Sequence, residues 1–87
     1  MRTLEEIKAF ETEFFEKVWY DRHSMLRGKR KISPEILEEA ERHAREIEIK
    51  YKGKVGPYST LAWGMLLGKL SALRWVLGDE WEDFLDT

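Results

Sequence analysis

The sequence predicts an all-α fold, a three-helix bundle-like domain with a short fourth helical segment at the C-terminal end. Three stretches carry apolar residues at the three-to-four-residue spacing of a helix that faces a core. Each stretch follows a Ser or Thr suited to cap a helix, and each is closed by a glycine. No stretch predicts a strand. We therefore expect a single helical domain over residues 1–87, with the helix over 60–77 at its centre.

The first helix is predicted over residues 4–27. Thr3 and Glu6 match the capping box, in which a hydroxyl and a carboxylate satisfy free backbone N–H groups at a helix start. Gly28 supplies the stop. Glu11 and Arg22 fall on the otherwise apolar side of this helix, where an unpaired charge is unfavourable. We expect each of them to meet an opposite charge on another helix or another chain.

The second helix is predicted over residues 34–52. Ser33 is its cap, Pro34 takes the first helical position and Gly53 ends it. Its apolar stripe consists of Ile36, Leu37, Ala40, Ala44, Ile47 and Tyr51. The opposite face is charged, so this is an ordinary amphipathic helix.

The third helix is predicted from the cap Ser59 to the stop Gly78, and it has two apolar sides. One side carries Trp63, Leu66, Leu70, Leu73 and Leu77; the other carries Gly64, Gly68, Ser71 and Ala72 with Met65, Trp75 and Val76 around them. A helix that is apolar nearly all round normally has neighbours on both sides. Asp79 then caps the short fourth segment, 80–85, which returns Trp81, Phe84 and Leu85 to the body.

Small residues spaced by four give the third helix its most informative pattern. They let a second helix approach closely, whereas a glycine inside a helix otherwise costs about 1 kcal/mol relative to alanine. The neighbour is either the first helix of the same chain or another chain. We expect a non-enzymatic protein-interaction or self-association module, acting as a homodimer or with a larger protein partner. Its candidate interface residues are Gly64, Gly68, Ala72 and Trp75, with Glu11 and Arg22 setting the charge register.

A basic cluster between the first two helices supports an alternative function. Arg27, Lys29, Arg30 and Lys31 form a loop that is able to contact phosphates, as in a nucleic-acid-associated accessory protein. The same residues also suit a solvated loop that attracts acidic side chains, since 78–87 carries five acidic residues and no basic one. The sequence leaves both interpretations open.

The composition excludes several classes of protein. The chain has 87 residues, a net charge of −2 and no cysteine, which excludes a multidomain enzyme, a disulfide framework and a thiolate nucleophile. It also lacks Asn and Gln and is 37% charged, a composition typical of heat-adapted or idealised proteins. The N-terminus does not match a signal peptide, and charges interrupt the longest apolar stretch. We expect a cytoplasmic protein without a membrane segment.

Catalytic and metal-binding patterns are weak. His23 and His43 are the only histidines, they lie on different predicted helices, and neither belongs to a metalloprotease or di-iron motif. Glu39 and His43 are four residues apart and share a helix face, a pairing that is usually a surface interaction. We expect no catalytic residue, no metal and no cofactor.

Residues 63–81 read W-G-M-L-L-G-K-L-S-A-L-R-W-V-L-G-D-E-W. This segment resembles the ending of a group of short prokaryotic proteins that carry no assigned activity, and residues 19–23 resemble them weakly. The resemblance implies a natural small protein rather than a designed one. It implies no reaction, cofactor or ligand.

Overall fold

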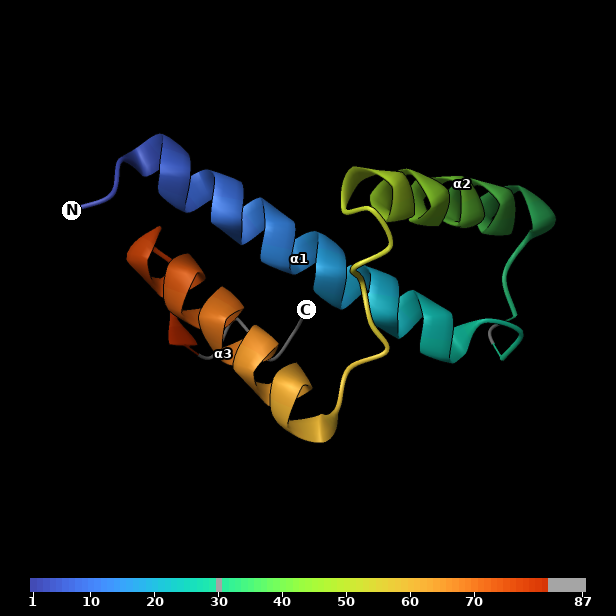
Figure 1. Ribbon diagram of the computed structural model, residues 1–87. Helices are drawn as coiled ribbons and strands as arrows, with labels where there is room; N and C mark the ends of the chain where they lie inside the picture. Colours follow the sequence, from blue (N-terminus) through green and yellow to red (C-terminus); the bar gives the residue numbers. More distant parts are fainter. Residues whose placement is uncertain (30, 82–87) are drawn as a thin grey trace. The chain divides into compact units, whose positions relative to one another are not determined.

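The computed structural model describes residues 1–29 and 31–81. These residues contain three α-helices and no strand. The helices are α1 (Leu4–Leu26), α2 (Pro34–Lys50) and α3 (Thr60–Val76) (Figure 1). The all-α prediction is confirmed for these residues, and every helix begins and ends within two residues of the predicted position. The fourth helical segment is predicted over residues 80–85, and its residues 82–85 lie outside the described part of the chain.

The helix starts are set by the predicted caps. The Oγ1 atom of Thr3 accepts the backbone N–H of Glu6 at 3.1 Å, and the Glu6 carboxylate accepts the backbone N–H of Thr3 at 3.2 Å. Ser33 and Ser59 each accept the backbone N–H three residues further on, at 3.3 Å and 3.1 Å. These bonds satisfy N–H groups that have no partner inside the helix.

The end of α2 shows why a glycine is needed there. Gly53 has a φ angle of +78°, in the left-handed region where a side chain is strained. This turn brings the N–H of Gly53 to the carbonyl of Glu48 at 2.8 Å, which closes the helix. The sequence therefore identified the stop correctly.

The chain divides into two compact units that share α1. Unit 1 contains Met1–Phe15 and the residues from Ser59 onward, and unit 2 contains Glu16–Tyr58. The first half of α1 thus belongs with α3, and the second half belongs with α2.

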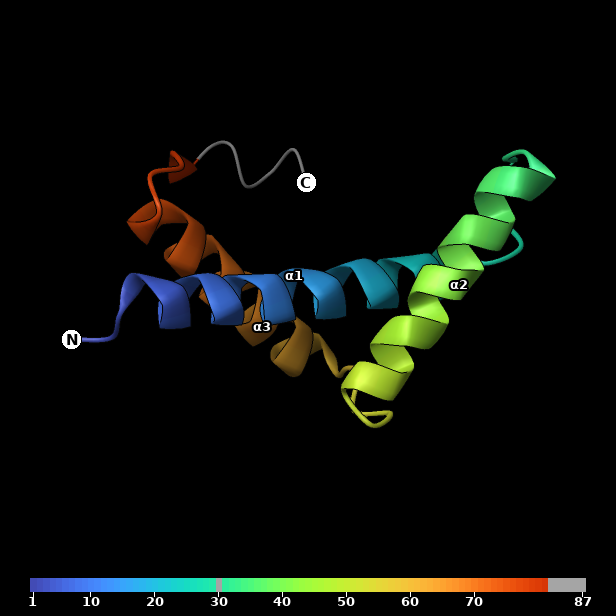
Figure 2. The same ribbon diagram turned by 90° about the horizontal axis from the view of Figure 1, so that it is seen from above.

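In unit 1, α3 runs antiparallel to the first half of α1, as Figures 1 and 2 show. Leu66 and Leu70 of α3 form the core and are 8% and 0% exposed. The guanidinium of Arg74 lies 5.1 Å from the ring centre of Phe15, a cation–π distance. Burial of the leucine side of α3 therefore holds this unit together.

In unit 2, α2 runs back obliquely across the second half of α1 (Figure 2). Val18, Ala44, Ile47 and Val55 are its buried apolar side chains, each less than 5% exposed. Two of them come from α2, one from α1 and one from the loop that follows α2. The loop after α2 is therefore part of the core of this unit.

Only one of the two apolar sides of residues 60–77 is covered among the residues that the structure describes. The leucine side of α3 is covered, but on the other side Leu61 is 75% exposed and Val76 is 56% exposed. The helix that both units share is α1. Apolar periodicity shows that a helix side avoids water, but it carries no information on whether the cover comes from the same chain.

Candidate functional site

The uncovered side of α3 is an exposed apolar surface in unit 1. Its residues, here called the open face, are Leu61, Gly64, Met65, Gly68, Ala72, Trp75 and Val76, all of them exposed. At 100° per residue they span an arc of roughly 120° around the helix. None of them is charged, although 37% of the residues in the chain are.

The small residues of the open face have no neighbour in the described chain. A Cβ atom built on Gly64 or on Gly68 would meet no described atom outside the helix within 4 Å. The first of the two neighbours considered from the sequence, the helix α1 of the same chain, therefore does not cover these glycines. The stripe of small residues is open along its first two positions.

An exposed aromatic pair lies at the C-terminal end of the open face. The rings of Trp75 and Trp81 are stacked, with centres 5.3 Å apart and planes 7° from parallel. They are 51% and 53% exposed. Tryptophan pairs of this kind are enriched where proteins meet, because they contribute a large rigid surface.

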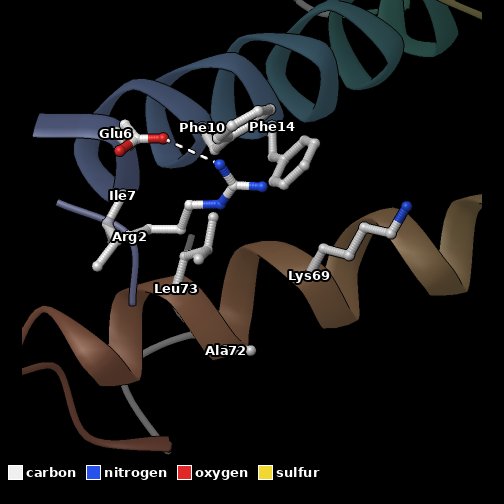
Figure 3. Close-up of a pocket in the computed structure, with 8 residues that line it drawn as sticks. All are labelled: Arg2, Glu6, Ile7, Phe10, Phe14, Lys69, Ala72 and Leu73. Carbon is white, nitrogen blue, oxygen red and sulfur yellow. Dashed lines mark hydrogen bonds and ion pairs between the residues drawn. The ribbon is translucent and has the colours of Figure 1, made fainter. Parts of the chain in front are cut away.

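A cavity of about 270 Å³ adjoins the open face in unit 1 (Figure 3). It is lined by Arg2, Glu6, Ile7, Phe10, Phe14, Lys69, Ala72 and Leu73. Ala72 belongs both to the cavity and to the open face. At one end Arg2 pairs with Glu6 at 3.3 Å, and Lys69 lies at the other. The cavity thus has apolar walls and an ionic rim, which suits an apolar side chain or tail.

The two charges predicted to set a register have different surroundings. The Nε–H of Arg74 donates to Oε1 of Glu11 at 3.1 Å, and both side chains are largely buried. Glu11 therefore meets its opposite charge on another helix of its own chain, one of the two outcomes expected from the sequence. Arg22 belongs to unit 2, so the structure assigns the two residues to different units.

The basic loop is partly engaged within unit 2. The Nε–H of Arg27 donates to Oε1 of Glu41 at 3.0 Å. Lys29 and Lys31 are exposed, and Arg30 lies outside the described residues. The loop's role in phosphate binding stays a prediction.

Polar contacts join α1 to α2 in unit 2. Glu16 accepts from the ammonium of Lys50 at 2.7 Å and from the hydroxyl of Tyr51 at 2.8 Å. Burial by itself would raise the pKa of Glu16, but these two hydrogen bonds outweigh it and lower that pKa. Burial and the bond to Glu16 raise the pKa of Tyr51 to about 12. Further along, the Tyr20 hydroxyl donates to Glu48.

Both histidines contact the ring of Trp19. His23 is 2% exposed, and its Nε2–H donates to Oε1 of Glu41 at 3.1 Å. Its ring stacks on Trp19 with centres 5.0 Å apart, while His43 meets the same indole edge-on at 4.5 Å. No three His, Asp or Glu side chains in the described ranges are grouped to hold a metal. Glu39, the remaining candidate, is exposed on α2.

A second cavity, of about 300 Å³, lies in unit 2 and was not anticipated from the sequence. It is lined by Tyr20, Asp21, Ser24, Val55, Gly56 and Pro57. Asp21 is 8% exposed, and burial raises its pKa. The signal was available, because Asp21 follows Phe14 by seven residues and so lies on the same side of α1 as this apolar residue.

No protein-family model, curated protein or solved structure matches the sequence. The resemblance of residues 63–81 to short prokaryotic proteins stays a prediction. No described helix is both long enough and apolar enough to cross a bilayer.

Proposed function

We propose that the protein is a non-enzymatic self-association module that forms a homodimer through the open face of α3. The observation that carries the proposal is this face itself, which has seven exposed apolar or small residues and no charge. A contiguous apolar patch on an otherwise charged protein is typical of an interaction surface. Withdrawal of this patch from water supplies the free energy of association.

A second copy of the chain fits the shape of the open face. The small residues Gly64, Gly68 and Ala72 form a stripe beside Met65, and Leu61 and Trp75 lie at its two ends. In an antiparallel pair centred on Gly68, Gly64 lies opposite the partner's Ala72 and Leu61 lies opposite the partner's Trp75. The backbones then approach closely in the middle while large side chains seal both ends. Such a contact is self-complementary, as a two-fold interface requires.

The charges beyond α3 favour the antiparallel direction. Asp79 and Glu80 follow the C-terminal end of the helix, and no acidic residue lies in its first turn. In an antiparallel pair these carboxylates come near the N-terminus of the partner's α3, where free N–H groups favour negative charge. A parallel pair would instead bring two negative ends together.

The exposed area supports a dimer that dissociates on dilution. Leu61, Met65, Trp75 and Val76 are each more than half exposed. Their pairing would bury on the order of 1,000 Å² in total, near the lower limit for a specific interface. We therefore expect monomer and dimer to exchange at micromolar concentration.

Sedimentation equilibrium of matched arginine variants tests the proposal. Leu61→Arg places a charge on the open face, whereas Ile49→Arg places one on α2 in unit 2; the two native side chains are 75% and 78% exposed. We expect the wild type and Ile49→Arg to dimerise and Leu61→Arg to sediment as a monomer. A wild type that is monomeric up to millimolar concentration would refute the proposal, and so would equal dimerisation of the two variants.

A second variant separates association from folding. Gly68→Leu adds a side chain where no described atom outside the helix lies within 4 Å of the new Cβ, and leucine has the higher helix propensity. The single chain should therefore fold at least as well as the wild type. We expect the dimer to be lost, because the leucine holds the two backbones apart. Retention of the dimer would show that the glycine stripe is not the contact.

A further inference from the structure

Asp21 is a buried carboxylate without a cationic partner in the described chain. It is 8% exposed, and its side chain makes no hydrogen bond or ion pair with a described residue. Two partly exposed acidic groups of unit 2 are paired by contrast, Glu16 with Lys50 and Glu41 with Arg27. A buried carboxylate is strongly unfavourable unless a cation or several hydrogen bonds compensate for the lost water.

The space beside Asp21 is open rather than filled. The cavity of about 300 Å³ lies between one side of α1, with Tyr20 and Ser24, and the loop that contains Gly56. A Cβ on Gly56 would come within 3.0 Å of Oδ1 of Asp21, so the loop passes over the carboxylate with only a hydrogen in between. The φ angle of Gly56 is +102°, which also favours glycine.

The polar groups of this cavity are all able to accept hydrogen bonds. Among its lining side chains only Tyr20, Asp21 and Ser24 are polar, and none is basic. Tyr20 uses its proton in the bond to Glu48, and its oxygen, already bonded to Ser24, keeps one further lone pair as an acceptor. A ligand that presents several N–H donors and one positive charge fits this set.

We propose that the Asp21 cavity binds a guanidinium group. A guanidinium has five N–H donors in a plane, which match the two carboxylate oxygens of Asp21 and reach the Ser24 and Tyr20 oxygens beside it. It is also more weakly hydrated than an ammonium ion or a metal ion, so it enters a buried site more readily. Gly56 closes one side of the carboxylate, so the planar group would enter from the cavity that Asp21 also lines.

NMR titration of the full chain with methylguanidinium tests the site. We expect saturable shifts of the Asp21 side-chain carboxyl carbon, and a fall in the pKa of Asp21 because the bound cation favours the ionised form. N-methylurea has the same shape without the charge and should leave the carboxyl signal unchanged. Equal binding of methylurea, methylammonium or Na⁺ would overturn the proposal, as would the absence of a saturable shift with methylguanidinium.

Two carboxyl variants locate the binding. Asp21→Asn keeps the shape of the side chain and removes its charge, so methylguanidinium affinity should fall about tenfold or more. Asp79→Asn removes an exposed carboxylate in unit 1 and should leave the affinity unchanged. Binding that survives in Asp21→Asn would place the cation elsewhere and refute the assignment.

A capped Gly-Arg-Gly peptide and free agmatine distinguish the source of the group. Both contain the guanidinium, and the proposal requires that at least one bind through Asp21. Tighter binding of the peptide would assign the group to an arginine of a protein partner. Tighter binding of agmatine would assign it to a small metabolite. Failure of both to compete with methylguanidinium would overturn the proposal.

Discussion

Units 1 and 2 are built alike, each from half of α1 and one further helix, but they differ in what their second helix shows to water. The outer surface of α2 carries many charges, among them Glu38 and Arg45. The outer surface of α3 is the uncharged open face. An amphipathic helix is complete once its single apolar stripe is covered. In a two-helix unit, the single neighbouring helix covers only one side of a helix that has two apolar sides. The composition of the outer face therefore decides whether a unit needs a further partner to cover it.

The two units also differ in how α1 is held. In unit 2 polar contacts recur along the helix pair, at Glu16, Tyr20 and His23. In unit 1 Arg74 pairs with Glu11 between the two helices, and the buried Leu66 and Leu70 provide apolar packing. Directional polar contacts fix one register, whereas apolar packing tolerates adjustment. The register between the two helices is therefore fixed more tightly in unit 2 than in unit 1.

Truncation of the core side chains gives the largest expected effect. Leu70 is 0% exposed and Ile47 is 1% exposed. Leu70→Ala and Ile47→Ala should each lower the free energy of unfolding by about 2–5 kcal/mol, because each leaves a cavity. Urea unfolding followed by circular dichroism measures the loss, and hydrogen exchange should localise it to α3 or to α2. A loss below about 1 kcal/mol in either variant would contradict the described packing of that unit.

Removal of the Glu41 carboxylate tests the polar contacts of unit 2. Glu41→Gln weakens the bonds to His23 and Arg27, so we expect the free energy of unfolding to fall by about 1–2 kcal/mol. Glu38→Gln, an exposed position on the same helix, is the control and should change it by less than about 0.5 kcal/mol. Equal effects would show that the contacts with His23 and Arg27 contribute nothing to stability.

Glycine replacements contrast the open face with a turn in the other unit. At Gly64 nothing described lies near a new Cβ, so Gly64→Ala should stabilise the monomeric chain by up to about 1 kcal/mol. At Gly53 the φ angle is +78°, so Gly53→Ala should destabilise it by about 1 kcal/mol. Thermal unfolding at concentrations below dimer formation gives both values. A destabilising Gly64→Ala at those concentrations would mean that the face is covered within the chain.

Among the predicted effects on stability, we expect the smallest from acidification, which should weaken unit 2. Glu16 and Glu41 have pKa values lowered below 4.5 by their hydrogen bonds, against the opposing effect of burial. Their stabilisation is therefore present above pH 4.5 and is lost as the pH falls through the lowered values. Asp21 acts in the opposite sense, because burial raises its pKa above 3.8 and its protonation favours the fold. Thermal unfolding of the Glu16→Gln/Glu41→Gln variant between pH 7 and about pH 3 should show a smaller acid-induced loss than the wild type.

Local signals predicted the elements of this fold well. The capping residues Thr3, Ser33 and Ser59 mark helix starts, and Gly28 and Gly53 mark the ends, because these choices depend on backbone groups a few residues away. The partner of Glu11 was anticipated as an opposite charge, but its identity was not. Arg74 lies 63 positions away, and no local pattern selects it from the other basic residues.

For the candidate sites too, the sequence shows the residues, and only the tertiary structure shows their surroundings. The stripe of Gly64, Gly68 and Ala72 is visible in the sequence, whereas its exposure is not. Asp21 is visible as an acid in phase with Phe14, but only the return of the loop at Gly56 places a cavity beside it. Burial of a side chain depends on contacts between distant segments, and periodicity does not encode which segments those are.

The sequence alone determined the three helices, their caps and stops, and the presence of two apolar sides on the helix that became α3. These properties follow from hydrogen bonding and side-chain spacing within one segment. The tertiary structure decided which half of α1 each helix joins, which side of α3 stays open, and that Asp21 is buried without a paired cation. Those outcomes depend on which surfaces remove the most apolar area from water together, a property of the whole chain that no single segment contains.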